Sequence, residues 1–159
     1  MLYASLKAAH LLAVIAWVGG MFFMLMCLRP AVHEVLEAPP RVRLMHATLR
    51  RFLRIVGLAV LAILVSGAAM IFMAWRDRAA AGLAFNMPLD WYALVALFFA
   101  MLAVFLHVRF PLFARVTRAI TAQAWPDAGA ALGAIRWEVA INLVLGIFVV
   151  VLVRLGAAA

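Results

Sequence analysis

The stretch IVGLAVLAILVSGAAMIFMAW, residues 55–75, decides the fold because it contains no charged side chain from end to end. An α-helix rises about 1.5 Å per residue, so roughly 20 apolar residues cross the ~30 Å hydrocarbon layer of a bilayer. Three further apolar stretches are interpreted in the same way: residues 2–28, 89–111 and 139–153. The sequence therefore predicts an all-α integral membrane protein in which four helices form an up-down bundle.

The composition excludes a soluble domain. Hydrophobic residues make up 70% of the 159 residues and charged residues only 13%, a balance that one soluble core cannot hide. The first apolar stretch is too long for a signal peptide and is not followed by a cleavage site and a soluble domain, so we expect it to be retained. Because no long linker or low-complexity tail interrupts the chain, residues 1–159 are predicted to form a single transmembrane domain.

The positive charges predict the orientation in the membrane. The net charge is +8, yet the basic residues lie between the apolar stretches and form no nucleic-acid-binding face, so we expect no nucleic-acid partner. Six arginines fall within residues 29–54 and four within 109–136, whereas Lys7, Arg76, Arg78 and Arg154 lie on the other side. Under the positive-inside rule the two arginine-rich connections face the cytoplasm. We therefore expect both termini on the outer side of the membrane.

Two histidines lie inside the predicted spans and are the leading candidates for function. On the first helix His10 shares one face with Val14, Trp17, Met21 and Met24, and this face should point into the bundle. A second stripe there consists of small residues, and residues 93, 96, 100 and 103 form a similar alanine stripe in line with His107. Small residues let a neighbouring helix, or a flat cofactor, approach closely.

The depth of each residue suggests two separate half-sites. With midplanes near residues 15, 65, 100 and 147, His10 lies roughly 8 Å toward the outside and His107 roughly 10 Å toward the cytoplasm. At the outer level the second helix offers Met70 and, a turn higher, Met73. At the inner level the candidates around His107 are Met21, Met24, Asn142 and Cys27. The same reasoning places Glu138 at the cytoplasmic boundary, with Arg109 or Arg51 as its expected partner.

These residue types suit copper, although ordinary structural roles stay open. An imidazole in a membrane is costly to leave unpaired, so it is a functional candidate, but histidines also join helices by hydrogen bonds. Thioethers prefer Cu(I), and imidazole accepts copper in either state. Methionine is equally a flexible core residue. His33 and His46, in a basic loop, are expected to be structural, and the arginines around Arg51 mark topology or hold an anion such as a haem propionate.

Several segments together resemble a known family. They are LKAAHLLAVIAWVGGMFFMLMCLRPA at residues 6–31, LRRFLRIVGLAVLAILVSGAAMIF at 49–72, FLHVRF at 105–110, AWPDAGAALGAIR at 124–136 and RWEVAINLVLGIFVVV at 136–151. The chain is similar in these segments to small bacterial membrane proteins of the CopD (copper resistance D) family. The resemblance implies copper tolerance or uptake across the bacterial inner membrane, so that the outer side, with both termini, is the periplasm.

A more distant resemblance is to HemJ, the membrane protoporphyrinogen oxidase. Lys7, His10, Trp17, Arg136 and Asn142 match its pattern loosely. That family carries a lysine soon after the tryptophan that opens its third span, and the corresponding WYALVAL at residues 91–97 has none. What this resemblance still implies is haem b, with His10 and Met70 as axial ligands or with His107 under a haem on the alanine stripe.

Three hypotheses follow for the function. The preferred one is a copper-handling protein, not an enzyme, in which His10, Met70 and Met73 receive the ion from a periplasmic donor and His107, Met21, Met24 and Cys27 pass it inward. The second is a haem b redox protein, related to HemJ, that exchanges electrons with quinone or oxidises a porphyrinogen. In it His10 with Met70, or His107, ligates the haem, and Arg51 holds a propionate. The third is an accessory subunit whose polar residues only fix helix packing in the lipid bilayer.

Overall fold

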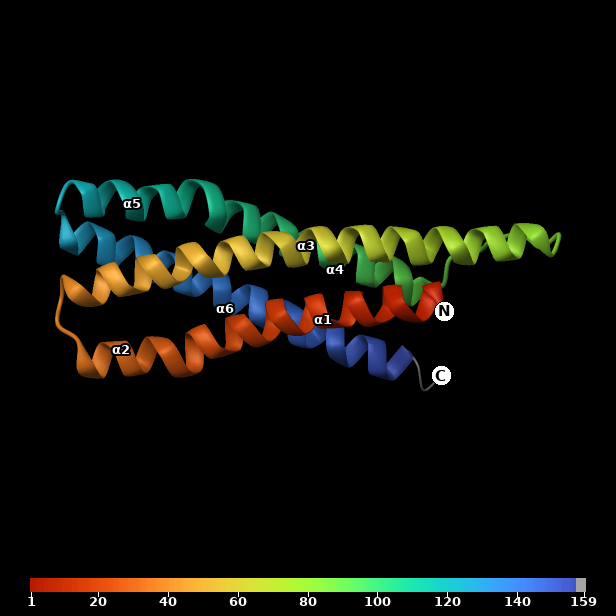
Figure 1. Cartoon of the computed structure of the whole chain (residues 1–159), viewed down its shortest axis with the longest axis horizontal. Helices are drawn as coiled ribbons and strands as arrows, with labels where there is room; N and C mark the ends of the chain where they lie inside the picture. The colour runs from red at the N-terminus through yellow and green to blue at the C-terminus, as the bar shows by residue number, and fades with distance from the viewer. Residues whose placement is uncertain (157–159) are drawn as a thin grey trace.

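Four long helices make up the part of the chain that the structure, a computed structural model, describes, residues 1–156 (Figure 1). The first rod consists of α1 (Leu2–Phe23), the π-helical turn η1 (Met24–Leu28) and α2 (Arg29–Val35). The second is α3 (Pro40–Ala80). The third consists of α4 (Leu89–His107), the π-helical turn η2 (Val108–Leu112) and α5 (Phe113–Thr121), and the fourth is α6 (Trp125–Gly156). No strand occurs within these residues, and the predicted all-α bundle is confirmed.

Two prolines explain the π-helical turns. Pro30 opens α2 and Pro111 lies inside η2. Proline has no amide hydrogen, and its ring collides with the carbonyl four residues earlier in a regular α-helix. A wider π turn moves that carbonyl aside and lets the helix continue. As a result the first and third rods run on to Val35 and Thr121, past the predicted span ends at Leu28 and Pro111.

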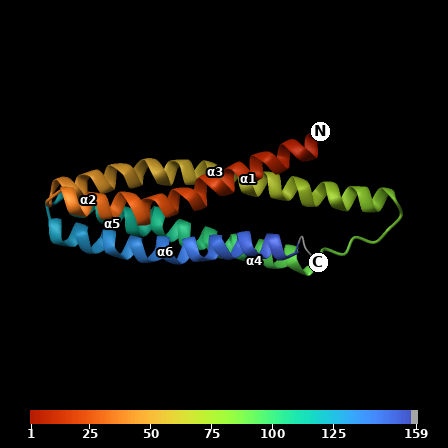
Figure 2. The ribbon, with the colours of Figure 1, turned by 90° about the horizontal axis from the view of Figure 1, so that it is seen from below.

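The helices pair in a way that gives the bundle two chemically different ends. α1 packs along α3, α6 packs along α4 and α5, and further contacts join α1 to α6 and α3 to α5. The N-terminus lies at the same end as the last turns of α6, and α3 projects beyond that end (Figures 1 and 2). We call this the terminal end. The opposite end, formed by α2, the first turns of α3, α5 and the first turns of α6, is called the arginine-rich end.

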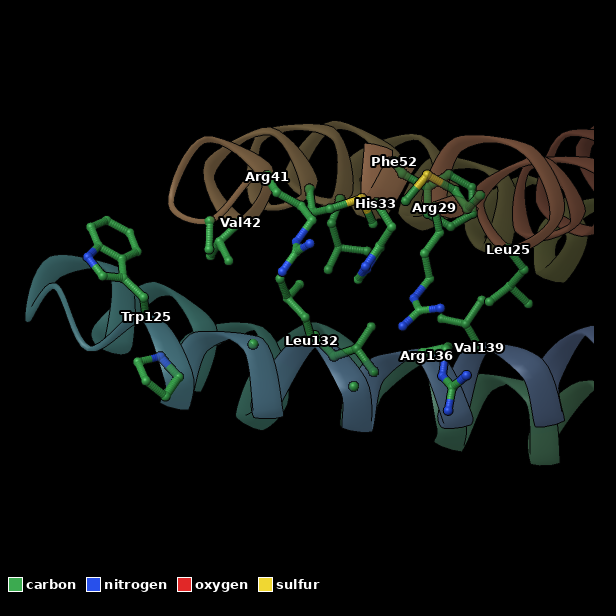
Figure 3. A pocket seen from close by; sticks show the side chains of 18 residues that line it. Leu25, Arg29, His33, Arg41, Val42, Phe52, Trp125, Leu132, Arg136 and Val139 are labelled. Atoms are coloured by element: carbon green, nitrogen blue, oxygen red, sulfur yellow. The ribbon is translucent and has the colours of Figure 1, made fainter. Parts of the chain in front are cut away.

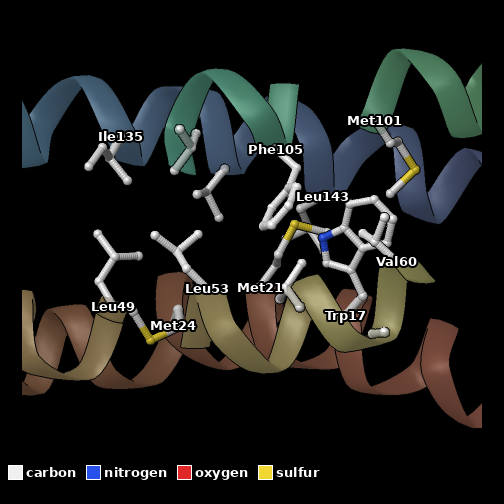
Figure 4. Packing of buried hydrophobic residues seen from close by; sticks show 14 of the residues in the cluster. Trp17, Met21, Met24, Leu49, Leu53, Val60, Met101, Phe105, Ile135 and Leu143 are labelled. Atoms are coloured by element: carbon white, nitrogen blue, oxygen red, sulfur yellow. The ribbon is translucent and has the colours of Figure 1, made fainter. Parts of the chain in front are cut away.

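Apolar side chains fill the centre of the bundle. Trp17 and Met21 of α1 are 3% and 1% exposed, and the Trp17 ring meets Phe105 of α4 edge to face with centroids 6.2 Å apart (Figure 4). Leu53 from α3 and Leu143 from α6 close the cluster. Met24 is also buried, whereas His10 and Val14 are half-buried, so the predicted inward face of the first helix is confirmed.

The outer surface of the bundle is apolar, as expected for a chain that lies in lipid. Leu12, Leu58, Phe99 and Val144 are each more than half exposed although they are hydrophobic. The four long helices are all apolar enough to cross a membrane. The alanine stripe of α4 is part of this surface, because Ala96, Ala100 and Ala103 are exposed and no described helix covers them.

Candidate functional site

His10 on α1 faces Ser66 on α3 near the terminal end of the bundle. The Nδ1 atom of His10 lies 2.8 Å from the Ser66 hydroxyl oxygen. Ser66 is only 4% exposed and His10 is half-buried, so this polar contact is enclosed between two apolar helices. The Cβ of a residue at Gly67 would lie 3.5 Å from Cε1 of the imidazole. The backbone of α3 at Gly67 therefore lies beside the imidazole, at a distance where a Cβ would make an ordinary van der Waals contact.

The hydrogen bonds of Ser66 determine which nitrogen of His10 carries the proton. The Ser66 hydroxyl donates its single hydrogen to the carbonyl oxygen of Ala62 one turn earlier, with the carbonyl of Ile63 3.3 Å away. The same oxygen can then only accept from His10, so Nδ1–H of His10 is the donor. In the neutral imidazole this tautomer leaves a free lone pair on Nε2.

Met70 and Met73 continue the face of α3 that carries Ser66. They follow Ser66 by four and seven residues, which is one and two helical turns, and both are half-buried. The apolar runs predict Met70 at the level of His10. In the structure Ser66 lies at that level, and Met70 lies one turn farther toward the terminal end. The difference arises because α3 projects past α1, so the centres of their apolar runs do not lie opposite each other (Figure 1).

His107 lies apart from the methionines that were grouped with it. Its Nδ1 is 3.3 Å from a carboxylate oxygen of Glu138 on α6, with side-chain exposures of 52% and 29%. Glu138 thus faces His107, and the expected partners Arg109 and Arg51 form no ion pair with it in the described structure. The pairing satisfies both groups at the bundle surface, which agrees with the general rule that ionisable groups in a membrane find a partner.

The other predicted inner ligands are dispersed. Met21 and Met24 lie in the apolar core, Cys27 is an exposed thiol in η1, and Arg51 is exposed on α3. Within residues 1–156 no three His, Cys, Asp or Glu side chains gather into a cluster that could hold a metal ion. A copper site in this part of the chain would therefore depend on one imidazole together with thioethers.

His46 has the structural role that the sequence suggested. Its Nε2 lies 2.9 Å from the hydroxyl oxygen of Thr117, and its ring stacks on Phe113 with centroids 4.9 Å apart. Thr117 donates to the carbonyl of Phe113, so the imidazole nitrogen donates to Thr117. These contacts attach α3 to α5, and they engage both the Nε2 atom and the ring face of His46.

The family model of Copper resistance protein D matches residues 46–155. The chain belongs to the CopD family. It is therefore a multi-pass membrane protein of a family named for copper resistance, as the resemblance implied. No curated protein and no solved structure matches it significantly.

The matched region omits α1, so the family assignment rests on the other three rods. Ser66 lies within the matched region, and His10 lies outside it. Sequence reasoning selected His10 but missed Ser66. The signal was available, because Ser66 is the only hydroxyl in the apolar run 55–75, and a lone hydroxyl in a membrane helix is expected to have a hydrogen-bond partner.

Proposed function

We propose that this CopD-family protein handles copper and binds the ion at the terminal end of the bundle through Nε2 of His10. The observation that supports the proposal is the hydrogen-bond chain from His10 to Ser66 to Ala62. Histidines that ligate metals commonly donate their other ring N–H to a fixed acceptor, which sets the tautomer and the ring orientation. His10 has this arrangement before any metal binds.

Thioethers on α3 are the proposed companions of the imidazole. Met70 and Met73 lie on the face that carries Ser66, toward the terminal end. Cu(I) is a soft ion that accepts one imidazole with thioethers, whereas Zn²⁺ prefers thiolates or several imidazoles. The residues available near His10 therefore favour Cu(I) as the bound species.

The predicted inner copper site, His107 with Met21, Met24 and Cys27, has less support. Met21 and Met24 lie in the core, while His107 faces Glu138 at the surface and Cys27 is exposed. Reaching one ion together would require these side chains to leave their present partners. The proposal is accordingly confined to copper binding at His10.

The proposed orientation places this site on the periplasmic side. The terminal end carries few positive charges and the arginine-rich end carries most of them, so the positive-inside rule puts His10 in the outer half of the inner membrane. A periplasmic copper donor is the partner that this orientation suggests.

The test is Cu(I) binding to the purified full-length protein in detergent, measured by competition with a chromophoric Cu(I) chelator. We expect one tightly bound Cu(I) per chain, lost in His10→Ala and kept in His33→Ala, a matched control at the opposite end. Equal Cu(I) binding by the wild-type protein and His10→Ala would refute the proposal.

The same preparation separates the competing functions. A Soret absorbance that disappears in His10→Ala would reject the copper site and favour haem b. If the protein is colourless, binds no Cu(I) and supports copper tolerance equally well with or without His10, the accessory function is favoured. The three outcomes are distinct because haem absorbs strongly, Cu(I) does not, and a packing residue changes neither.

A further inference from the structure

A cavity of about 340 Å³ opens between α2, α3 and α6 at the arginine-rich end. Its size falls in the usual range for small-molecule sites, about 300–1,000 Å³. In Figure 3 the side chains of Arg29, His33 and Arg41 extend from the first two rods across this space toward α6. Arg136 is the basic residue that α6 contributes. The cavity lies far from His10 and does not depend on the proposed copper site.

The charged side chains that line the cavity are all basic, and no acidic side chain balances them within the lining. Three arginines and one histidine line it, and no carboxylate is among the lining residues. In the described part of the chain, the buried Nε of Arg136 has no hydrogen-bond partner, while the guanidinium stacks on Trp137 with its central carbon 4.8 Å from the ring centroid. A buried donor without an acceptor is costly, and guanidinium groups gathered together repel one another. An anion would relieve both effects.

His33 experiences the same positive field. It lies in α2, beyond the predicted membrane span 2–28, and its pKa is lowered first by burial and then by the positive charges of Arg29 and Arg41. The cavity thus disfavours an additional positive charge.

The position of the cavity along the bundle indicates the kind of anion. Arg29 comes directly after the predicted span 2–28, and Arg136 comes shortly before the predicted span 139–153. The predicted spans therefore put both side chains just outside the hydrocarbon layer, at the depth expected for lipid phosphates. The rest of the lining is mostly apolar, including Leu25, Phe52 and Val139, which lead from the arginines toward the membrane.

We propose that this cavity is a binding site for a phosphate group, presented by the headgroup of an anionic phospholipid whose acyl chain follows the apolar wall. Arg29, Arg41 and Arg136 bind the phosphate oxygens by charge-assisted hydrogen bonds, for which the planar guanidinium is well suited. Phosphate suits the site because it offers several acceptor oxygens to the guanidinium groups that three helices contribute to the lining. Free inorganic phosphate has the same chemistry, and the experiment distinguishes the two sources.

The experiment is native mass spectrometry of the full-length protein in detergent, titrated separately with dioleoyl phosphatidylglycerol, dioleoyl phosphatidylcholine and inorganic phosphate. We expect phosphatidylglycerol to bind more tightly than phosphatidylcholine. Arg29→Gln and Arg136→Gln should each weaken phosphatidylglycerol binding about tenfold, because each removes hydrogen bonds to a charged group. Arg115→Gln and Arg118→Gln are the matched controls, since both arginines are exposed on α5 at the same end and neither lines the cavity.

Each result has a defined meaning. Loss of phosphatidylglycerol binding in the cavity variants, with the controls unchanged, supports the lipid site. If inorganic phosphate binds and displaces no lipid, with the same dependence on Arg29 and Arg136, the phosphate site is supported with a soluble source. Equal loss in all four variants indicates general surface attraction and overturns the proposal, as does binding that no variant weakens. A Soret band that depends on Arg29 and Arg136 would assign the arginines to haem carboxylates and also overturn it.

Discussion

Replacing Ser66 by alanine tests the link between hydrogen bonding and copper binding. Ser66 is 4% exposed, and its hydroxyl is the acceptor for Nδ1–H of His10 at 2.8 Å. Without it the imidazole loses the partner that fixes its tautomer, and Nε2 carries the proton in part of the population. Loss of such a supporting hydrogen bond typically weakens metal binding about 10- to 100-fold, or roughly 1.4–2.8 kcal/mol. We therefore expect Ser66→Ala to lose this much Cu(I) affinity, whereas His10→Ala loses the site altogether.

Cu(I) competition titrations of Ser66→Ala, Ser66→Thr and the wild-type protein measure the effect. The threonine variant keeps the hydroxyl and should retain most of the affinity. Nitrogen-15 NMR of labelled histidine gives a second readout, because the shifts of Nδ1 and Nε2 report which nitrogen is protonated, and the proton should be on Nδ1 in the wild-type protein. If Ser66→Ala binds Cu(I) as tightly as the wild-type protein while His10→Ala does not bind, the tautomer argument is refuted even though His10 remains the ligand.

Two further predictions concern packing and orientation. A Cβ at Gly146 would lie 2.9 Å from Cγ2 of Val18 and 3.3 Å from Cε of Met101, so Gly146→Val should lower the free energy of unfolding in detergent by about 1–3 kcal/mol. Gly19→Val, where nothing lies within 4 Å, is the control and should unfold with a smaller change. In a cysteine-free background, a membrane-impermeant thiol reagent should label Ala84→Cys in intact cells and Ala122→Cys only after lysis. The reverse labelling pattern would contradict the proposed orientation.

The sequence predicted the four helices because a long apolar run has few alternatives in a bilayer. The ends of the helices were harder to predict. The apolar runs predict span ends at Leu28 and Pro111. Pro30 and Pro111 lie at these positions, and proline usually ends a helix. The structure continues through both sites by a π-helical turn. Neighbouring helices stabilise that turn by packing, and the local sequence does not reveal it.

The site was predictable only in part, for a similar reason. Helical periodicity correctly predicted that His10 and Trp17 point into the bundle. Which side chains share a face depends only on the sequence of one helix. The level at which α1 meets α3 depends on tilt and on how far each helix projects, which the apolar runs do not define. Sequence reasoning therefore placed Met70 opposite His10 in place of Ser66. The arginine cavity was missed because residues 29, 41 and 136 come together only when three helices pack.

The apolar centre of the bundle determines what a copper site at His10 can do. Between His10 and the arginine-rich end lie Trp17, Met21 and Phe105, which are at most 8% exposed. The void beside them is about 10 Å³, and the buried Oδ1 of Asn142 in its wall has no hydrogen-bond partner. A space of that size holds at most about one water molecule, so a hydrated ion does not fit into this void in the described conformation. Passage through it would require its neighbours Trp17 and Phe105 to separate. Under the proposed function, His10 would therefore capture copper, and any transport would be a second step that depends on helix movement.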